Sequence, residues 1–364
     1  MRFGTTVVML VVALLVVSGC SSDVEQPIKI GVSLPFTGPA ATPGNYVKQG
    51  FEIAVSHLPI DEQKRVKFVY EDDRCDPTTG LTAAKKLAEL DGVHFTMGPI
   101  CGAVINPTLQ YYDDQHVLRM HSGLGLDSYM DHGTYRFTLL GRLESLMKKL
   151  AAHAYNTGDH SVAILHLDDD YGRESAKYFA QYFIEAGGKI VTTESFPRGE
   201  LDYRTQMLKI KESKPDGVFL ASYGPQLVSA LRQLNESAVH GQVYGIYNTE
   251  DPETIRSAGA LSEGMIYPYF AVEDSPAKTR FQEEYKTRFN ITNEMLSANA
   301  YDSFNLMWDA IKLCEEDVDC VRGKILATKD YLGASGRITV DTQGVADKAL
   351  VIKRVTKGHF EVIP

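Results

Sequence analysis

The stretch Ile28-Lys-Ile-Gly-Val-Ser-Leu34 begins the pattern that decides the fold. It is a short apolar run typical of a strand, and residues at helical spacing follow it: Val47, Phe51, Ala54, Val55 and Leu58. A second run, Val66-Lys-Phe-Val-Tyr70, and a third, Val93-His-Phe-Thr-Met97, continue the cycle, with a helical stretch at 79–90 between them. Alternation of this kind predicts βαβ units and a parallel sheet.

The pattern begins again after Tyr135-Arg-Phe-Thr138. Strands are expected at 161–166, 190–193, 217–221 and 242–247, with helical stretches between them. A length of 364 residues also suggests two domains. We therefore expect an α/β fold of two doubly wound lobes with parallel sheets. Ligands of such sheets bind beyond the carboxyl ends of the strands, so a cleft between the lobes is the expected binding place.

The first twenty residues have the anatomy of an export signal. Arg2 precedes an apolar run from Val7 to Val17, and small residues lead to Cys20. A transmembrane anchor is the alternative, but it needs about 20 apolar residues, roughly twice this run. A Cys after the small pair is the pattern of a bacterial lipoprotein signal. We expect a signal peptide at 1–19, a lipid on Cys20, a polar tether at 20–28, and a protein exported and held on a bacterial membrane.

Four cysteines remain once Cys20 carries lipid, and an oxidising compartment favours disulfides. Four cysteines allow three pairings. Closure of the short loop between Cys314 and Cys320 costs the least chain entropy, which leaves Cys75 to pair with Cys101. Metal binding is the competing interpretation, but the spacings are not CxxC and no His lies close by, so we expect no metal.

Composition narrows the class of function. The chain is 44% hydrophobic and 23% charged, with a net charge of -10 and no Lys/Arg run, so a nucleic-acid partner is not expected. The sequence contains no GxSxG, HExxH, P-loop or GxGxxG motif, so we expect neither an enzyme nor a cofactor.

Six short motifs occur in an order that resembles one family, the type I periplasmic binding proteins of the leucine/isoleucine/valine-binding kind. They are Ile30-Gly-Val-Ser-Leu-Pro-Phe-Thr-Gly-Pro39, Tyr70-Glu-Asp-Asp-Arg-Cys-Asp-Pro77, Gly98-Pro-Ile-Cys101, Asp169-Asp-Tyr-Gly172, Ala300-Tyr-Asp302 and Gly333-Ala-Ser-Gly-Arg-Ile338. The resemblance covers nearly all of the mature chain. It implies lobe one at 29–139 and 272–332, lobe two at 140–271 and 333–364, and a three-stranded hinge between them. It also implies a disulfide between Cys75 and Cys101.

The resemblance also indicates site residues in lobe one. Relatives that bind amino acids hold the carboxylate with a Ser and a Thr, whose positions are Gly102 and Gly125 here. Backbone amides around Ser122, Gly123 and Gly125 could take over that task, because glycines allow close approach and turn amides bind anions. His121 is a further candidate. The alternative is that the glycines only shape turns.

Lobe two supplies the other candidates. Tyr171 and Tyr223 match positions that line the cleft, where a ring with a polar tip suits a solute. Tyr247 is a further candidate that follows the next strand. Glu250 is expected to pair a ligand ammonium, with Asp251 as its rival. Asp302 begins a helix and has a structural or a ligand role. The acids beside Cys75 (Asp72, Asp73 and Asp76) do not fit a calcium loop and are interpreted as turn residues.

The resemblance implies a substrate-binding lipoprotein of an ABC importer, with the permease complex as partner. The expected ligand is a small solute: amino acid-like, an amide or an aromatic acid. Two alternatives stay open. The same lobes can sense a ligand for a signalling partner, and an exported two-domain hydrolase can share the layout.

Overall fold

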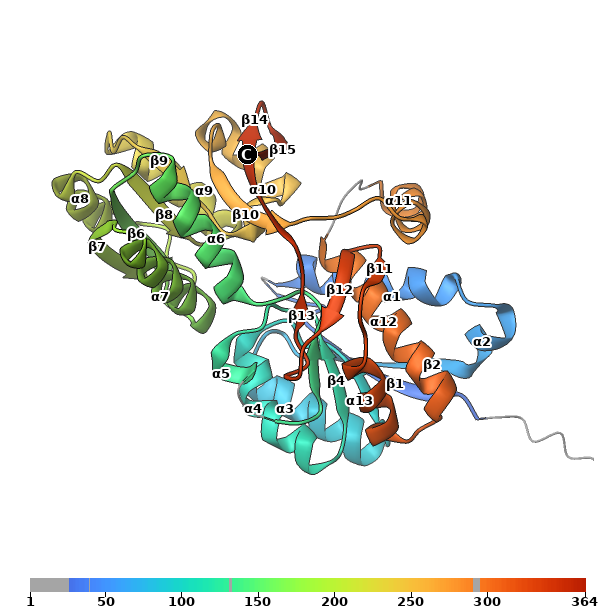
Figure 1. Cartoon of the computed structure of the whole chain (residues 1–364). Coiled ribbons are helices and arrows are strands. Elements are labelled where there is room, and N and C mark those ends of the chain that lie inside the picture. Colours follow the sequence, from blue (N-terminus) through green and yellow to red (C-terminus); the bar gives the residue numbers. More distant parts are fainter. Residues whose placement is uncertain (1–25, 39, 131–132, 291–294) are drawn as a thin grey trace, which may run out of the picture.

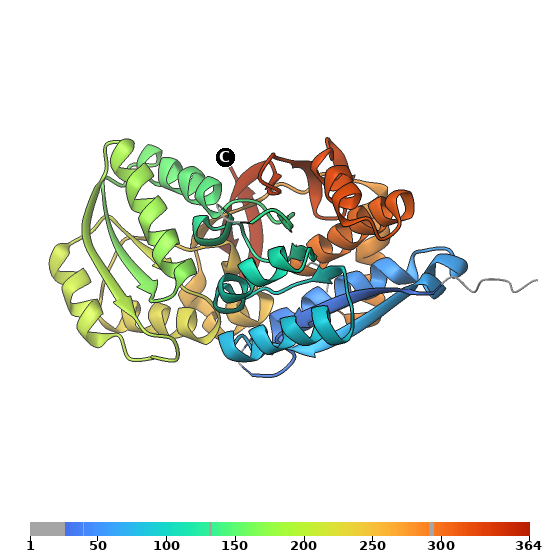
Figure 2. The ribbon, with the colours of Figure 1, turned by 90° about the horizontal axis from the view of Figure 1, so that it is seen from below.

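The computed structural model describes residues 26–38, 40–130, 133–290 and 295–364. Two lobes lie side by side and are joined by three segments of chain (Figures 1 and 2). The expected α/β fold with two sheets is confirmed. The signal peptide, Cys20 and most of the tether lie outside the described residues.

Lobe one is built on a five-stranded parallel sheet with the order β2-β1-β3-β4-β5. Its strands are β1 (Ile28–Leu34), β2 (Val66–Asp72), β3 (Phe95–Met97), β4 (Leu118–His121) and β5 (Arg136–Thr138). Its first helices are α1 (Ala41–Ser56), α2 (Ile60–Arg65), α3 (Pro77–Lys85), the π-helical turn η1 (Lys86–Leu90), α4 (Gly102–Asp114) and α5 (Asp127–Met130). The chain returns later for α11 (Pro276–Phe289), α12 (Met295–Cys314) and α13 (Val318–Leu326). A small antiparallel sheet follows, of β11 (Tyr331–Gly333), β12 (Gly336–Val340) and β13 (Ala346–Asp347).

Lobe two has a seven-stranded sheet with the order β15-β14-β10-β9-β8-β6-β7. Its parallel strands are β6 (Ser161–Leu167), β7 (Lys189–Phe196), β8 (Gly217–Ala221), β9 (Gln242–Tyr244) and β10 (Ile266–Phe270). Two antiparallel strands, β14 (Leu350–Thr356) and β15 (His359–Ile363), extend one edge. Its helices are α6 (Leu143–Asn156), α7 (Asp170–Glu185), α8 (Arg204–Ser213), α9 (Gly224–Glu236) and α10 (Pro252–Ala258), with 3-10 turns η2 (Tyr247–Thr249) and η3 (Gly259–Ser262). The sheet of lobe two is therefore mixed, because the last hairpin adds to a parallel core.

We propose that three crossover segments connect the lobes, at residues 139–142, 271–275 and 348–349. They lie close to one another. Thr138 and Gly125 form isolated bridges with Val345 and Arg142, and the Ala271 amide donates to the Ala349 carbonyl at 2.8 Å.

The boundary at Gly333 needs revision. The strands β14 and β15 belong to the sheet of lobe two, as the resemblance implied. Ile338 and Val340 of β12, however, are fully buried in the apolar core of lobe one. Because apolar packing ties β12 to that core, we propose that lobe two resumes near residue 348; the other two boundaries stay predictions.

Both expected disulfides are present, Cys75–Cys101 and Cys314–Cys320. The first joins the turn after β2 to the residue that precedes α4. It therefore fixes the start of α4, which lies at the carboxyl end of β3. Among the described residues, no helix combines the length and apolar character that crossing a bilayer requires.

Removal of the first disulfide is expected to destabilise the protein more than removal of the second. The two bonds close loops with sequence separations of 26 and 6 residues. In the chain-entropy model these correspond to about 3.5 and about 2 kcal/mol of unfolding free energy. Urea unfolding of the C75S/C101S and C314S/C320S double variants measures both losses. A larger loss for the Cys314–Cys320 pair would contradict the loop-entropy explanation.

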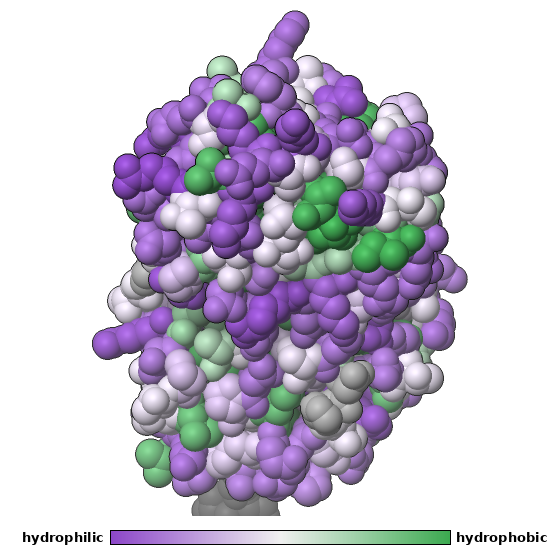
Figure 3. Space-filling view, turned by 90° about the vertical axis from the view of Figure 1, so that its left-hand side faces the viewer, coloured by the Kyte–Doolittle hydropathy of each residue, from purple (hydrophilic) through white to green (hydrophobic). Residues whose placement is uncertain are grey.

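The face of the molecule in Figure 3 is mainly hydrophilic, and its apolar residues form small separate patches. Scattered apolar residues of this kind are normal on a globular surface. The search for a binding site therefore turns to the strand ends between the lobes.

Candidate solute-binding site

The wall of lobe one is formed where β3 and β4 end. Gly102 is the first residue of α4, and a Cβ added to it would lie 3.9 Å from Asp170 Oδ2 of lobe two. Ser122 directly follows β4, is fully buried, and its Oγ has no partner among the described residues. At Gly123 an added Cβ would lie 3.2 Å from the Ile100 carbonyl oxygen and 3.7 Å from Tyr129 Oη. The backbone of the Ser122–Gly123 turn is therefore packed closely against Ile100 and Tyr129, and a side chain at position 123 would crowd it.

The wall of lobe two is aromatic. Three tyrosines lie a few residues beyond the carboxyl ends of β6, β8 and β9: Tyr171, Tyr223 and Tyr247. The ring centroid of Tyr171 is 6.3 Å from that of Tyr223 and 6.4 Å from that of Tyr247, within the range of aromatic pairs. Tyr171 Oη donates to Asn248 Oδ1 at 2.9 Å. Burial raises the pKa of Tyr171 and of Tyr223, so both hydroxyls stay protonated and can donate. The structure therefore brings the three predicted tyrosines together.

The two walls touch across the strand ends. Asn106 Nδ2 of α4 donates to Asp170 Oδ2 of α7 at 3.0 Å. One helical turn further on α7, the Glu174 carboxylate accepts from the backbone amides of Asp127 and Ser128 at 3.0 and 3.2 Å. Carboxylates that accept backbone amides at a helix start are favoured. These contacts hold the two sets of strand ends against each other.

Two predicted site residues lie elsewhere. The Gly125 amide donates to the Gly141 carbonyl of the first crossover at 2.7 Å, so this amide is not free for a ligand anion. Glu250 Oε2 accepts from Lys353 Nζ at 2.6 Å and from Tyr267 Oη at 2.9 Å, and the Glu250 side chain is only 3% exposed. Glu250 therefore forms a buried ion pair inside lobe two, and we no longer propose that it pairs with a ligand ammonium.

The other acids have structural contacts. Asp251 caps α10 by accepting from the amides of Glu253 and Thr254. Asp72 and Asp76 accept from backbone amides of the adjoining turns, as expected of turn residues. Asp302 lies inside α12 and not at the start of a helix as expected, because the helix already begins at Met295. It is fully buried and accepts from the amides of Ala334 and Ser335, which favours its structural role.

Sequence reasoning missed several residues of this region. Tyr129 packs edge-on against His121, at 5.2 Å between ring centroids, and lies beside Gly123. Arg198, just after β7, donates to Asp169 Oδ2 at 2.7 Å, and the Tyr223 hydroxyl lies 3.5 Å from the same oxygen. Position directly after a strand could have identified Arg198. Tyr129 lies in the short helix α5, and no pattern in the sequence around it indicates a site residue.

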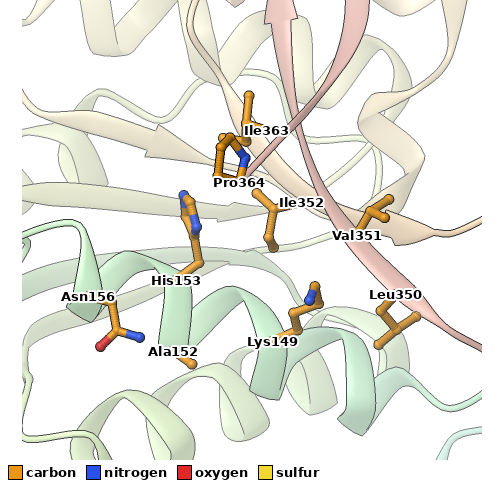
Figure 4. A pocket seen from close by; sticks show the side chains of 9 residues that line it. All are labelled: Lys149, Ala152, His153, Asn156, Leu350, Val351, Ile352, Ile363 and Pro364. Carbon is orange, nitrogen blue, oxygen red and sulfur yellow. The ribbon is translucent and has the colours of Figure 1, made fainter.

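Two surface hollows lie away from the strand ends. One of about 330 Å³ lies between α6 and the β14–β15 hairpin, with His153, Ile352 and Pro364 among its lining residues (Figure 4). The other, of about 590 Å³, lies between α10 and the turn of the same hairpin. Neither is lined by any of the three tyrosines, so neither coincides with the aromatic wall.

The chain belongs to the periplasmic binding protein family, whose model matches residues 27–359. Within it, the chain is a type I protein of the leucine/isoleucine/valine-binding kind, a solute-binding protein and not an enzyme. Membership implies that the protein is exported.

Individual relatives resemble the chain over most of its length. The leucine-, isoleucine-, valine-, threonine- and alanine-binding protein of Pseudomonas aeruginosa is 24% identical over 94% of each chain. The crystal structure of a leucine binding protein from Thermotoga maritima has a TM-score of 0.87 at 24% identity, over 93% of this chain and 98% of that one. A solute binding protein of an R. palustris ABC transporter, in complex with benzoate, has a TM-score of 0.84 at 15% identity, over 93% of this chain and 95% of that one. At these identities the solved structures show the fold alone.

Proposed function

We propose that the protein captures a small solute between its lobes and delivers it to the permease complex of an ABC importer. The observation that carries this proposal is the cluster of Tyr171, Tyr223 and Tyr247 at the strand ends of lobe two, opposite Gly102. The three crossovers are the segments that would absorb the rotation of one lobe against the other as a solute enters.

The chemistry of the walls indicates the class of solute. Three tyrosines offer apolar ring faces with hydroxyl tips, and Arg198 is a cation beside Tyr223. Gly102 has no hydroxyl to hold the carboxylate of a plain branched-chain amino acid. Two of the named relatives are amino acid-binding proteins, and the third is in complex with benzoate. We infer a small, partly apolar solute: amino acid-like, an amide or an aromatic acid.

A thermal-shift screen of a metabolite library tests this function. A compound that binds only the folded protein adds about 2.7 kcal/mol of stability at 100 times its Kd, and so raises Tm. We expect a compound of the named classes to do so without being altered. Conversion of the compound would instead support the hydrolase. Failure of every compound of these classes to raise Tm would contradict the proposed solute.

The tyrosines give a sharper prediction. Tyr171→Ala or Tyr223→Ala should weaken binding of the screened solute by about 30-fold or more, since loss of an aromatic hot spot costs about 2 kcal/mol. Tyr155→Ala is the matched control, because that ring packs on His160 and Phe183 within lobe two. Calorimetric titration should show unchanged affinity for the control. Equal affinity in all three variants would mean that the solute lies elsewhere.

The lipid anchor is a separate part of the proposal. We expect mass spectrometry of membrane-extracted protein to find a lipid-modified Cys20 as its first residue. Cys20→Ser should abolish that modification and change the amount of the protein that is recovered with the membrane fraction. The lipid anchor would be contradicted if the mature chain began at another residue. An unmodified Cys20 in protein from the membrane fraction would contradict it as well.

A further inference from the structure

A fully buried arginine lies inside lobe one, below the strand end that leads to Ser122. Arg119 of β4 has no exposed surface. Its Nη1 donates to Thr108 Oγ1 at the long distance of 3.5 Å, and its guanidinium lies 5.4 Å from the centre of the Tyr112 ring. Its Nε and Nη2 find no acceptor among the described residues. A buried donor without an acceptor is costly, and more so when it carries charge, so this location calls for an acceptor.

A second guanidinium adds to the positive charge. Arg136 of β5 is the register partner of Arg119, and residues paired across neighbouring strands project from the same face of the sheet. Arg136 is 6% exposed, and its Nε donates to the Tyr129 carbonyl at 2.8 Å. The Asp113 carboxylate lies within electrostatic reach of Arg119 but already accepts from the amides of Thr134 and Tyr135. Burial of Arg119 beside a like charge lowers its pKa to about 10, which leaves it charged at neutral pH.

Tyr112 adds another donor that lacks an acceptor. Tyr112 Oη is buried and has no partner among the described residues. Burial raises the pKa of Tyr112, so its hydroxyl keeps its proton. A water molecule that accepted from Arg119 and Tyr112 would bring two hydrogens that need acceptors themselves. A compact anion would bring no hydrogens of its own and would balance the charge of Arg119.

We propose that Arg119 and Tyr112 hold a small monovalent anion of halide size between β4 and α4. The site lies two residues before His121, at the base of the turn that carries Ser122 and Gly123. It is distinct from the solute site, and its role is to stabilise lobe one beneath that turn.

Bromide is the direct probe. In crystals grown with bromide in place of chloride, we expect an anomalous peak within about 3.5 Å of Arg119 Nε or Nη2, the range of a hydrogen bond to a large anion. Density for a water or a protein oxygen there, without an anomalous signal, would overturn the proposal.

Chloride dependence is the solution test. With gluconate keeping the ionic strength constant, each tenfold rise in chloride above the Kd should raise Tm by about 2 °C. Arg119→Met, which replaces the buried cation by an apolar chain of similar length, should abolish that rise. The control Arg322→Met, on α13 of the same lobe, should keep it. An equal chloride response in Arg119→Met and the wild type would contradict the anion site.

Discussion

Replacing Asp302 by Ala is expected to lower the free energy of unfolding by about 3–5 kcal/mol, because it leaves a buried cation without its counter-charge. Asp302 on α12 is fully buried, and its Oδ2 accepts from the Ser335 hydroxyl at 2.6 Å. That hydroxyl in turn accepts from Lys348 Nζ at 2.7 Å. Burial raises the pKa of Asp302 and lowers that of Lys348, and each group partly offsets the shift of the other. Lys348 lies on the third crossover, so the loss should loosen the junction of the lobes.

Asp309→Ala is the matched control for this variant. Asp309 is on the same helix, and its side chain is 62% exposed, so its loss should change the unfolding free energy by no more than about 0.5 kcal/mol. Urea unfolding measures both variants. Similar losses for Asp302→Ala and Asp309→Ala would show that the buried network does not stabilise the fold.

The second large effect is expected from Glu250→Ala. This change leaves Lys353, whose side chain is 14% exposed, without its carboxylate partner, and should lower the free energy of unfolding by about 3–5 kcal/mol. Solute affinity at a temperature where the variant is folded should stay the same, because Glu250 Oε2 is bonded to Lys353 and Tyr267. Glu253→Ala, an exposed position on α10, serves as the control. A stable Glu250→Ala variant with weakened binding would restore Glu250 to the ligand.

The sequence predicted the fold well because the relevant signals are local. The alternation that begins at Ile28 needs only neighbours three to seven residues away to distinguish strands from helices. The pairing of Cys314 with Cys320 follows from their short separation, and it left Cys75 for Cys101. The expectation for Tyr171 and Tyr223 came from the resemblance to the family, because a Tyr soon after a strand can equally pack on the surface of its lobe.

The failures concern residues whose partners are far away in the sequence. The Glu250 carboxylate is held by Lys353, 103 residues later, and nothing near Glu250 marks that contact. Asn106 and Asp170 are 64 residues apart and meet only because the lobes face each other. Gly125 could supply a turn amide, but the fold places it against Gly141. Tertiary packing determines such contacts, and the local sequence pattern around each residue does not indicate them.

The most direct test of the account is a crystal structure of the protein with the solute found by thermal shift. The account predicts solute density between the lobes, in contact with Tyr171 and Tyr223 on one side and with the backbone near Gly102 and Gly123 on the other. The account would be contradicted by solute density in the hollow beside His153 or in the hollow beside α10, if the strand ends of the two lobes were still packed on each other.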